Sequence, residues 1–216
     1  MALTKVIGSG TGDITKLQIL NGSNVNTAST DADDLIIEGP NDCGLSILSA
    51  TTGRIFFGDA SNDDAGSIRY VHSDDSMRFE ANDEEAMRIH SIGAVTKPLQ
   101  PAFLVTGSSS QANLADNTVL TFDTEIFDQN SDFASNTFNA PVTGRYQLQF
   151  RGRFDEVDQD ANWNRIEIIT SNRTYKSSII DPGALGSHPD YWSFATVVLA
   201  DMDAGDTAYV QWGQSG

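Results

Sequence analysis

The sequence has 216 residues, 39% of them hydrophobic, and a formal net charge of −17 at pH 7. This length and composition are those of a folded protein of one or two domains. Neither half of the chain is basic, which argues against nucleic acid and anionic membrane surfaces as partners. No apolar run approaches the roughly 20 residues of a membrane span, and the single Cys43 excludes an intrachain disulfide.

Turn-forming residues are abundant throughout and long runs of helix-forming residues are missing, so we expect a chain that is nearly all β. Residues 1–30 are rich in Gly, Ser, Thr and Asn, and only Leu17–Leu20 shows apolar alternation. We therefore expect a loosely structured leader with at most one strand, able to dock onto another protein.

Residues 31–96 alternate short apolar pieces with turn clusters at a spacing of roughly ten residues, which predicts many short strands. One helical turn is expected at residues 82–85, where Asn82 is followed three residues later by Glu85. A segment of about 60 residues is marginal when it must bury its own core. Either neighbouring chains complete it as an intertwined trimer, or it is a small self-sufficient sandwich.

Pro98 and Pro101 mark residues 97–101 as an extended linker, because proline cannot donate a ladder hydrogen bond. Strand patterns separated by breakers then predict a β-sandwich over residues 102–216. Its longest strand follows a turn at residues 141–144 and alternates apolar with polar side chains up to Phe154. We expect five aromatic side chains to fill the core or a seam between subunits: Phe122, Phe138, Tyr146, Phe150 and Trp192.

Candidate binding residues lie near the loop ends of this predicted sandwich. Exposed aromatic faces hold sugars or partner side chains, and neighbouring carboxylates add polar contacts. The same aromatic residues would also suit a core, and for Trp163 the two interpretations stay open. The candidates are Trp163, Tyr191, Asp155, Asp158 and Asp160.

A second acidic loop offers oxygen ligands for calcium at Asp201, Asp203 and Asp206, although solvated loop carboxylates explain the same pattern and no EF-hand spacing is present. No other cofactor is expected. None of the three histidines lies in a hydrolase or metalloprotease motif, and no phosphate-binding glycine loop is present. We therefore expect no enzymatic activity, while a glycosidase pair of carboxylates stays open in a chain with 30 acidic residues.

The pattern Phe138-x-Ala140-Pro141-Val142-x-Gly144-x-Tyr146, preceded by Thr118–Asp123, resembles the globular head of the collagen-tailed complement recognition protein and its tumour-necrosis-factor-like jelly-roll relatives. The resemblance covers residues 99–216. It implies a jelly-roll sandwich that forms a tight homotrimer and binds partners through its loops or sides. The family's last strand has no counterpart after Gly205–Val210, so we expect a gap or a free edge in the inner sheet, through a shortened sequence or a strand supplied by another segment.

Four blocks in order, within Leu35–Ser49, Gly53–Asp59, Gly66–Phe79 and Glu85–Ile89, resemble a recurring segment of bacteriophage tail-fibre and tail-spike proteins. That resemblance implies a homotrimeric virion component, made in the host cytoplasm, whose leader attaches to the particle. The jelly-roll head would adhere to a host cell-surface glycan or protein. The alternatives are a structural or decoration protein that binds other virion proteins, and a cell-surface glycan depolymerase.

Overall fold

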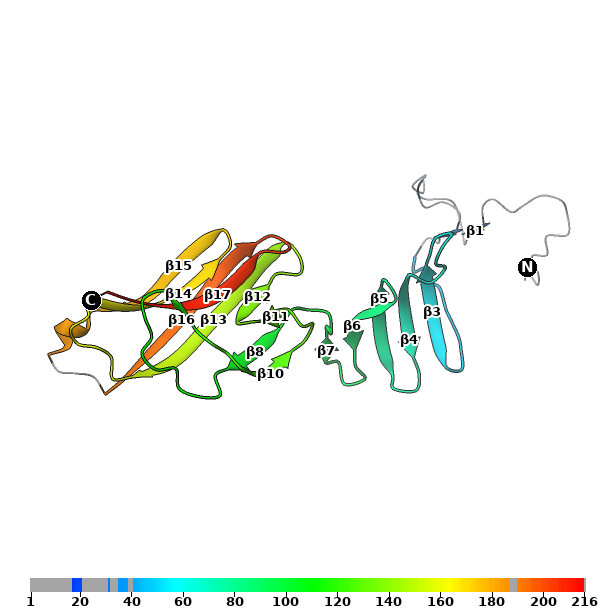
Figure 1. Ribbon diagram of the computed structural model, residues 1–216. Coiled ribbons are helices and arrows are strands. Elements are labelled where there is room, and N and C mark those ends of the chain that lie inside the picture. The colour runs from blue at the N-terminus through cyan, green and yellow to red at the C-terminus, as the bar shows by residue number, and fades with distance from the viewer. Residues whose placement is uncertain (1–16, 21–30, 32–34, 39–40, 187–189, 216) are drawn as a thin grey trace.

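The computed structural model describes residues 17–20, 31, 35–38, 41–186 and 190–215. The described chain is all β apart from one short 3-10 helix, η1 (Pro182–Leu185), which confirms the expected fold class. A pair of parallel strands, a single five-stranded sheet and a β-sandwich follow one another along the chain (Figure 1). No helix among the described residues is long and apolar enough to cross a membrane.

The parallel pair joins β1 (Leu17–Leu20) to β2 (Leu35–Glu38). Apart from β1, the predicted leader lies outside the described residues. The strand expected at Leu17–Leu20 is present.

The five-stranded sheet is an antiparallel meander in which each strand pairs with the next along the chain. We call residues 52–96 the stalk sheet. Its strands are β3 (Thr52–Phe57), β4 (Gly66–Val71), β5 (Ser76–Ala81), β6 (Glu84–Ile89) and β7 (Val95–Thr96).

The helical turn expected at residues 82–85 is wrong. Asn82 and Asp83 form the two-residue loop between β5 and β6, with φ of 54° and 63°. Two consecutive residues with positive φ are typical of a tight hairpin turn, and Asn and Asp tolerate that conformation better than most residues. The acidic residues that resembled a helix cap instead begin β6.

No strand lies between the end of β7 at Thr96 and the start of β8 at Phe103, so the two prolines fall between the stalk sheet and the sandwich. The Gln129 side chain fastens this segment to the sandwich. Its Nε2 donates hydrogen bonds to the carbonyl oxygens of Lys97 at 2.9 Å and Gln100 at 2.6 Å.

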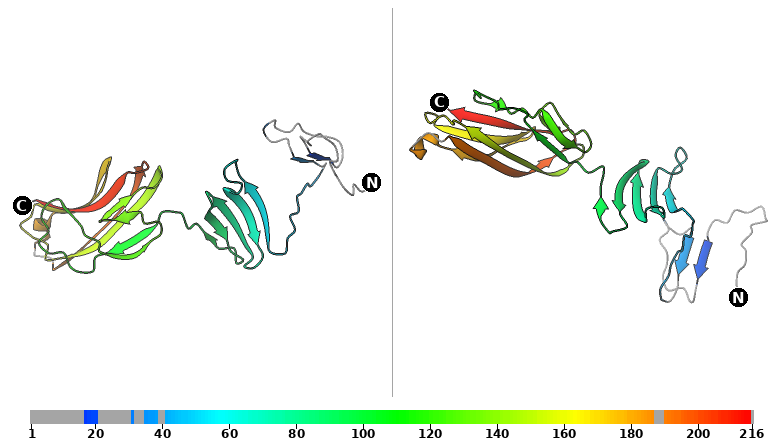
Figure 2. Two further views of the ribbon diagram at one scale, coloured as in Figure 1. Left: turned by 45° about the vertical axis from the view of Figure 1, so that its right-hand side comes forward. Right: turned by 90° about the horizontal axis from the view of Figure 1, so that it is seen from below.

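The sandwich begins with an outer sheet in the order β11-β12-β17-β14-β15, with β9 also paired to β17. Its strands are β9 (Thr118–Val119), β11 (Phe133–Ala134), β12 (Thr137–Asn139), β14 (Trp163–Thr170), β15 (Arg173–Ile180) and β17 (Thr207–Ser215). Facing it are two separate pairs: β13 (Gly144–Asp155) with β16 (Tyr191–Met202), and β8 (Phe103–Thr106) with β10 (Thr124–Asp128). The chain crosses repeatedly between the layers, as in a jelly roll (Figure 2).

Two clusters of buried side chains fill the space between the layers. One contains Phe138, Leu148, Ile168 and Val198, and the other contains Phe150, Ile166, Phe194 and Trp212. They arise from strict alternation in β13 and β16, where every second side chain turns inward. Three further aromatic residues of the predicted core, Phe122, Tyr146 and Trp192, are partly buried against these clusters.

The layer that contains β13 is not one continuous sheet. Among the described strands, β13 pairs with β16 alone, and β8 and β10 form a separate two-stranded sheet. The long strand β13 therefore has one occupied edge and one open edge.

Candidate functional site

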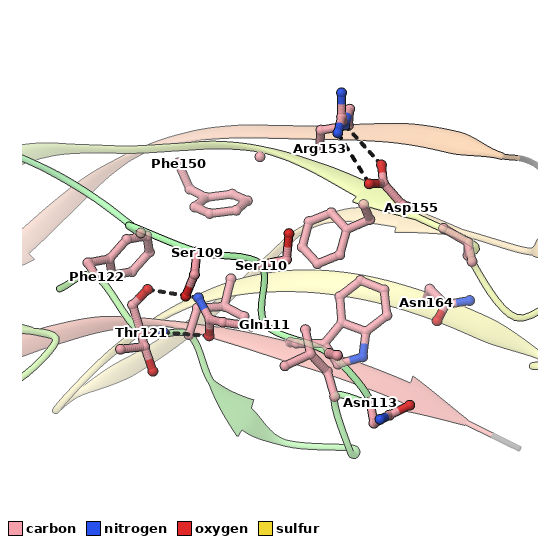
Figure 3. Close-up of a pocket in the computed structure, with 18 of the residues that line it drawn as sticks. Ser109, Ser110, Gln111, Asn113, Thr121, Phe122, Phe150, Arg153, Asp155 and Asn164 are labelled. Carbon is pink, nitrogen blue, oxygen red and sulfur yellow. Dashed lines mark hydrogen bonds and ion pairs between the residues drawn. The ribbon is translucent and has the colours of Figure 1, made fainter. Parts of the chain in front are cut away.

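A cavity of about 1150 Å³ opens beside β13. Its floor is apolar and is formed by core side chains that include Phe122, Phe150, Phe154 and Trp212. Residues 105–115 form the opposite wall (Figure 3). A ligand in this cavity would meet aromatic surface below and backbone and polar side chains at the sides.

The wall segment is held by two sets of hydrogen bonds. The backbone N–H and the hydroxyl of Ser108 both donate to the Asp123 carboxylate, at 2.6 and 2.5 Å, and they lower the pKa of Asp123. The Gln111 side-chain amide donates to the carbonyl of Thr121 and accepts from its N–H, each at 2.8 Å, as Figure 3 shows. Gln111 thus pairs with Thr121 as a neighbouring backbone amide would, and it ties the wall segment to the chain after β9.

Asn164 is the buried polar side chain of this cavity. It is 1% exposed, and neither its Nδ2 nor its Oδ1 has a hydrogen-bond partner. It lies on β14 in phase with the core residues Ile166 and Ile168, and its side chain lines the cavity (Figure 3). An unpaired buried amide costs about 1–3 kcal/mol, so this group favours a ligand that both donates and accepts.

At the rim of the cavity, Arg153 and Asp155 form an ion pair with 2.9 Å between Nε and Oδ1. The Arg153 guanidinium also lies 5.2 Å from the ring centre of Tyr191, which is 67% exposed. Asp155 and Tyr191 are directly opposite each other on β13 and β16. The structure therefore brings together two of the residues predicted for binding.

The other predicted binding residues are distributed differently. Asp158 lines the cavity, and its Oδ1 accepts a hydrogen bond from the backbone N–H of Asp160 at 2.9 Å. Trp163 packs against the Arg165 guanidinium, whose carbon lies 4.0 Å from the ring centre. Strand alternation turns Trp163 away from Asn164 and the cavity, so Trp163 and Tyr191 project from opposite layers.

The three carboxylates considered for calcium are not gathered into a metal site. Among the described residues, no group of three His, Cys, Asp or Glu side chains is placed to hold a metal ion. The Asp206 carboxylate instead accepts from the Ser171 hydroxyl at 2.5 Å, the Asn172 amide at 3.0 Å and the Asp203 backbone N–H at 2.8 Å. The Ser171 hydroxyl, as the main cause, and the Asp203 N–H lower the pKa of Asp206. The bond from Asp203 closes the turn before β17.

Sequence reasoning missed Asn164 and Gln111. A signal existed for Asn164, because it is a polar residue at the core phase of an otherwise apolar strand. No comparable signal marks Gln111, whose role depends on a segment of irregular backbone.

A second surface of interest is the apolar face of the stalk sheet. Strand register places two rows of apolar side chains on one face: Ile55, Ile68, Phe79 and Met87, and beside them Tyr70, Met77, Ile89 and Val95. No second layer of the described chain covers this face, and every buried hydrophobic side chain of the described residues lies at or beyond Leu120.

The opposite face of the stalk sheet is charged. Arg88 makes two contacts with Glu85, at 2.7 and 2.8 Å, and Arg78 pairs with Asp74 at 2.5 Å. Glu80 pairs with Arg69. These acids pair with Arg69, Arg78 and Arg88. Together with Arg54, these arginines form a row in which each lies directly opposite the next across adjacent strands.

The fold is a β-sandwich of jelly-roll type. Its inner layer consists of two separate pairs of strands, with the cavity beside β13. The chain is similar to the solved globular domain of zebrafish complement 1qA protein, with 18% sequence identity and a TM-score of 0.38, over 52% of this chain and 80% of that one. No protein-family model and no curated protein matches the chain.

Proposed function

We propose that the protein is a subunit of a homotrimeric bacteriophage fibre, in which the stalk sheets of three chains pack together and the sandwich heads adhere to a host cell-surface glycan or protein. The leader would attach the fibre to other virion proteins. The protein would act by adhesion, without catalysis, and its place would be the virion.

The observation that carries the proposal is the uncovered apolar face of the stalk sheet. Ile55 and Val95 on this face are 42% and 52% exposed in the single chain. Burying apolar surface contributes about 25 cal/mol per Å², so this face favours association with other apolar surface. Three sheets that turn their apolar faces toward a common axis would bury these rows.

The charged face supports the same arrangement. Its ion pairs are partly exposed, and they suit the solvent side of a thin fibre. Three of the four blocks that resemble tail-fibre proteins supply most of β3, β4, β5 and β6, and the first block contains β2. The resemblance and the two-faced sheet therefore concern largely the same residues.

Adhesion by the heads would depend on valency. Three heads on one fibre place three weak sites within reach of one surface, and linked sites bind far more tightly than single ones. The exposed rim at Arg153, Asp155 and Tyr191 provides charged and aromatic groups of the kind that contact sugars or proteins.

Two adjacent residues give a matched test of the trimer. Ile55 faces the apolar side of the stalk sheet, whereas Phe56 is 51% exposed on the charged side. Light scattering should give about three times the 23.3 kDa chain mass for the wild type and for Phe56→Glu, and a lower mass for Ile55→Glu. A wild-type monomer, or a mass lowered equally by both changes, would contradict the proposal.

Adhesion is tested by incubating the protein with bacterial cells and with their purified surface polysaccharide. Retention on cells without shortening of the polysaccharide is the expected result. Falling polysaccharide chain length would indicate a depolymerase. Neither retention nor cleavage would favour a structural or decoration role within the virion.

A further inference from the structure

The open edge of β13 is a row of unpaired backbone groups. In an antiparallel pair, every second residue directs its N–H and C=O away from the neighbouring strand. The twelve residues of β13 pair with β16 on one side, and no described strand pairs with the other. Such an edge is a template for an added strand.

The cavity lies along this open edge. Its lining includes Phe150–Asp155 of β13 and residues 105–115 opposite, and it includes no residue of β16. The cavity is therefore on the side of β13 that faces away from its partner strand. Side chains that point inward from an added strand would enter an aromatic space beside Phe150 and Trp212.

Gly152 shapes the wall of this space. A Cβ atom at position 152 would lie 2.5 Å from Cζ of Phe150, so the absence of a side chain lets the phenyl ring fold along the strand.

Asn164 supplies an independent indication of what the cavity holds. Its buried amide has a free donor and a free acceptor. A peptide backbone presents both complementary groups, whereas an apolar ligand would leave the amide unpaired. Hydrogen bonds from a bound peptide would therefore remove the free-energy cost of the unpaired Asn164 amide.

The outer face of β13 indicates the charge of that peptide. Arg145, Arg151 and Arg153 all point to this face and are exposed. Cross-strand neighbours of opposite charge stabilise a sheet, and like charges destabilise it. A second copy that paired through its own β13 with Arg145 opposite Arg151 would set arginines against arginines, so charge disfavours self-pairing in that register.

We propose that the open edge of β13 binds an extended segment of a partner polypeptide in which apolar residues alternate with acidic residues. The segment adds a strand to the β13–β16 sheet, its apolar side chains enter the cavity, and the Asn164 amide bonds to its backbone. The acidic side chains lie beside Arg145 and Arg151. This inference goes beyond the proposed function and does not depend on the packing of the stalk sheets.

The probes are two synthetic peptides of four dipeptide repeats, valine–glutamate and valine–lysine, offered to the full-length protein. The valine–glutamate peptide should bind and should slow amide hydrogen exchange within residues 144–155, with no effect on residues 173–180. The valine–lysine peptide should bind at least about tenfold more weakly, a difference of about 1.4 kcal/mol.

Three variants connect binding to the named residues. Arg151→Glu should lower the affinity for the valine–glutamate peptide by about tenfold or more, and it should raise the affinity for the valine–lysine peptide. Lys176→Glu makes the same charge change at an exposed residue of β15, on the other layer, and should alter neither affinity. Asn164→Leu should also weaken peptide binding while it leaves the midpoint of thermal unfolding unchanged or raises it, because it removes an unpaired buried amide.

Several results would overturn the proposal. Equal binding of both peptides, no protection of residues 144–155, or binding that is unaffected by Arg151→Glu would exclude this edge as an acidic-strand site. In the free protein, protection of the β13 amides that point away from β16, if it is independent of concentration, would show that the chain covers its own edge. Protection that grows with protein concentration would show pairing between copies.

Discussion

Phe150 combines a core position with a place in the cavity wall. Its ring is buried in one of the two core clusters and lies 6.3 Å from Phe122 and 6.5 Å from Phe154, centre to centre. Phe150→Ala should lower the free energy of unfolding by about 3–5 kcal/mol, because the neighbouring strands cannot close the space left by the ring. Denaturant unfolding measures this loss.

The control for that measurement is Phe127→Ala on β10, since Phe127 is 48% exposed. It should change the free energy of unfolding by a much smaller amount. Equal effects at the two positions would contradict the assignment of Phe150 to the core.

At the scale of elements, the charged face of the stalk sheet makes its stability depend on pH. The two contacts from Arg88 are the main cause that lowers the pKa of Glu85 below its ordinary value of 4.5. The ionised form is therefore favoured by folding, and its contribution is fully present above pH 4.5. The contribution is lost as the pH falls through the lowered pKa of the folded state.

Glu85→Gln should therefore destabilise the stalk sheet at neutral pH, and the difference from wild type should shrink as the pH falls below 4.5. Thermal unfolding across this pH range measures the effect. Glu84→Gln, at the exposed start of β6, is the matched control. A Glu85→Gln effect that persists unchanged at low pH would contradict an ionic origin.

Strand patterns in the sequence predicted some elements well and others poorly, for identifiable reasons. The long strand at β13 was predicted because its alternation is strict and a proline–glycine turn precedes it. The loop at Asn82–Asp83 was mistaken for a helix start, because Asn before acidic residues is also a capping pattern. The arginine row could not be predicted, since it depends on the register of four strands rather than on spacing along one.

Buried hydrophobic side chains are distributed unevenly between the sandwich and the rest of the described chain. Both core clusters lie in the sandwich, and every buried hydrophobic side chain of the described residues lies at or beyond Leu120. A fragment of residues 97–216 should therefore unfold cooperatively on its own, whereas residues 41–96 alone should lack a cooperative transition unless they associate. Circular dichroism during heating distinguishes the two, and a cooperative transition of the shorter fragment as a monomer would contradict this prediction.

The break in strand structure between β7 and β8 was visible in the sequence, because prolines act locally. The cavity was not visible, because its walls come from β13, β14, β17 and the segment before β9, which are far apart along the chain. Only the folded topology brings Asn164 to the open edge.

The order of strands in the stalk sheet also determines how the protein carries a mechanical load. The chain enters at β3 and leaves at β7, on opposite edges of the meander, and the strands lie across the long axis of the molecule (Figure 1). Tension along that axis would separate the strands one hydrogen-bonded pair at a time instead of shearing many pairs together. A single stalk sheet would therefore extend under low force, and the tensile strength of a fibre would come from the packing between its chains.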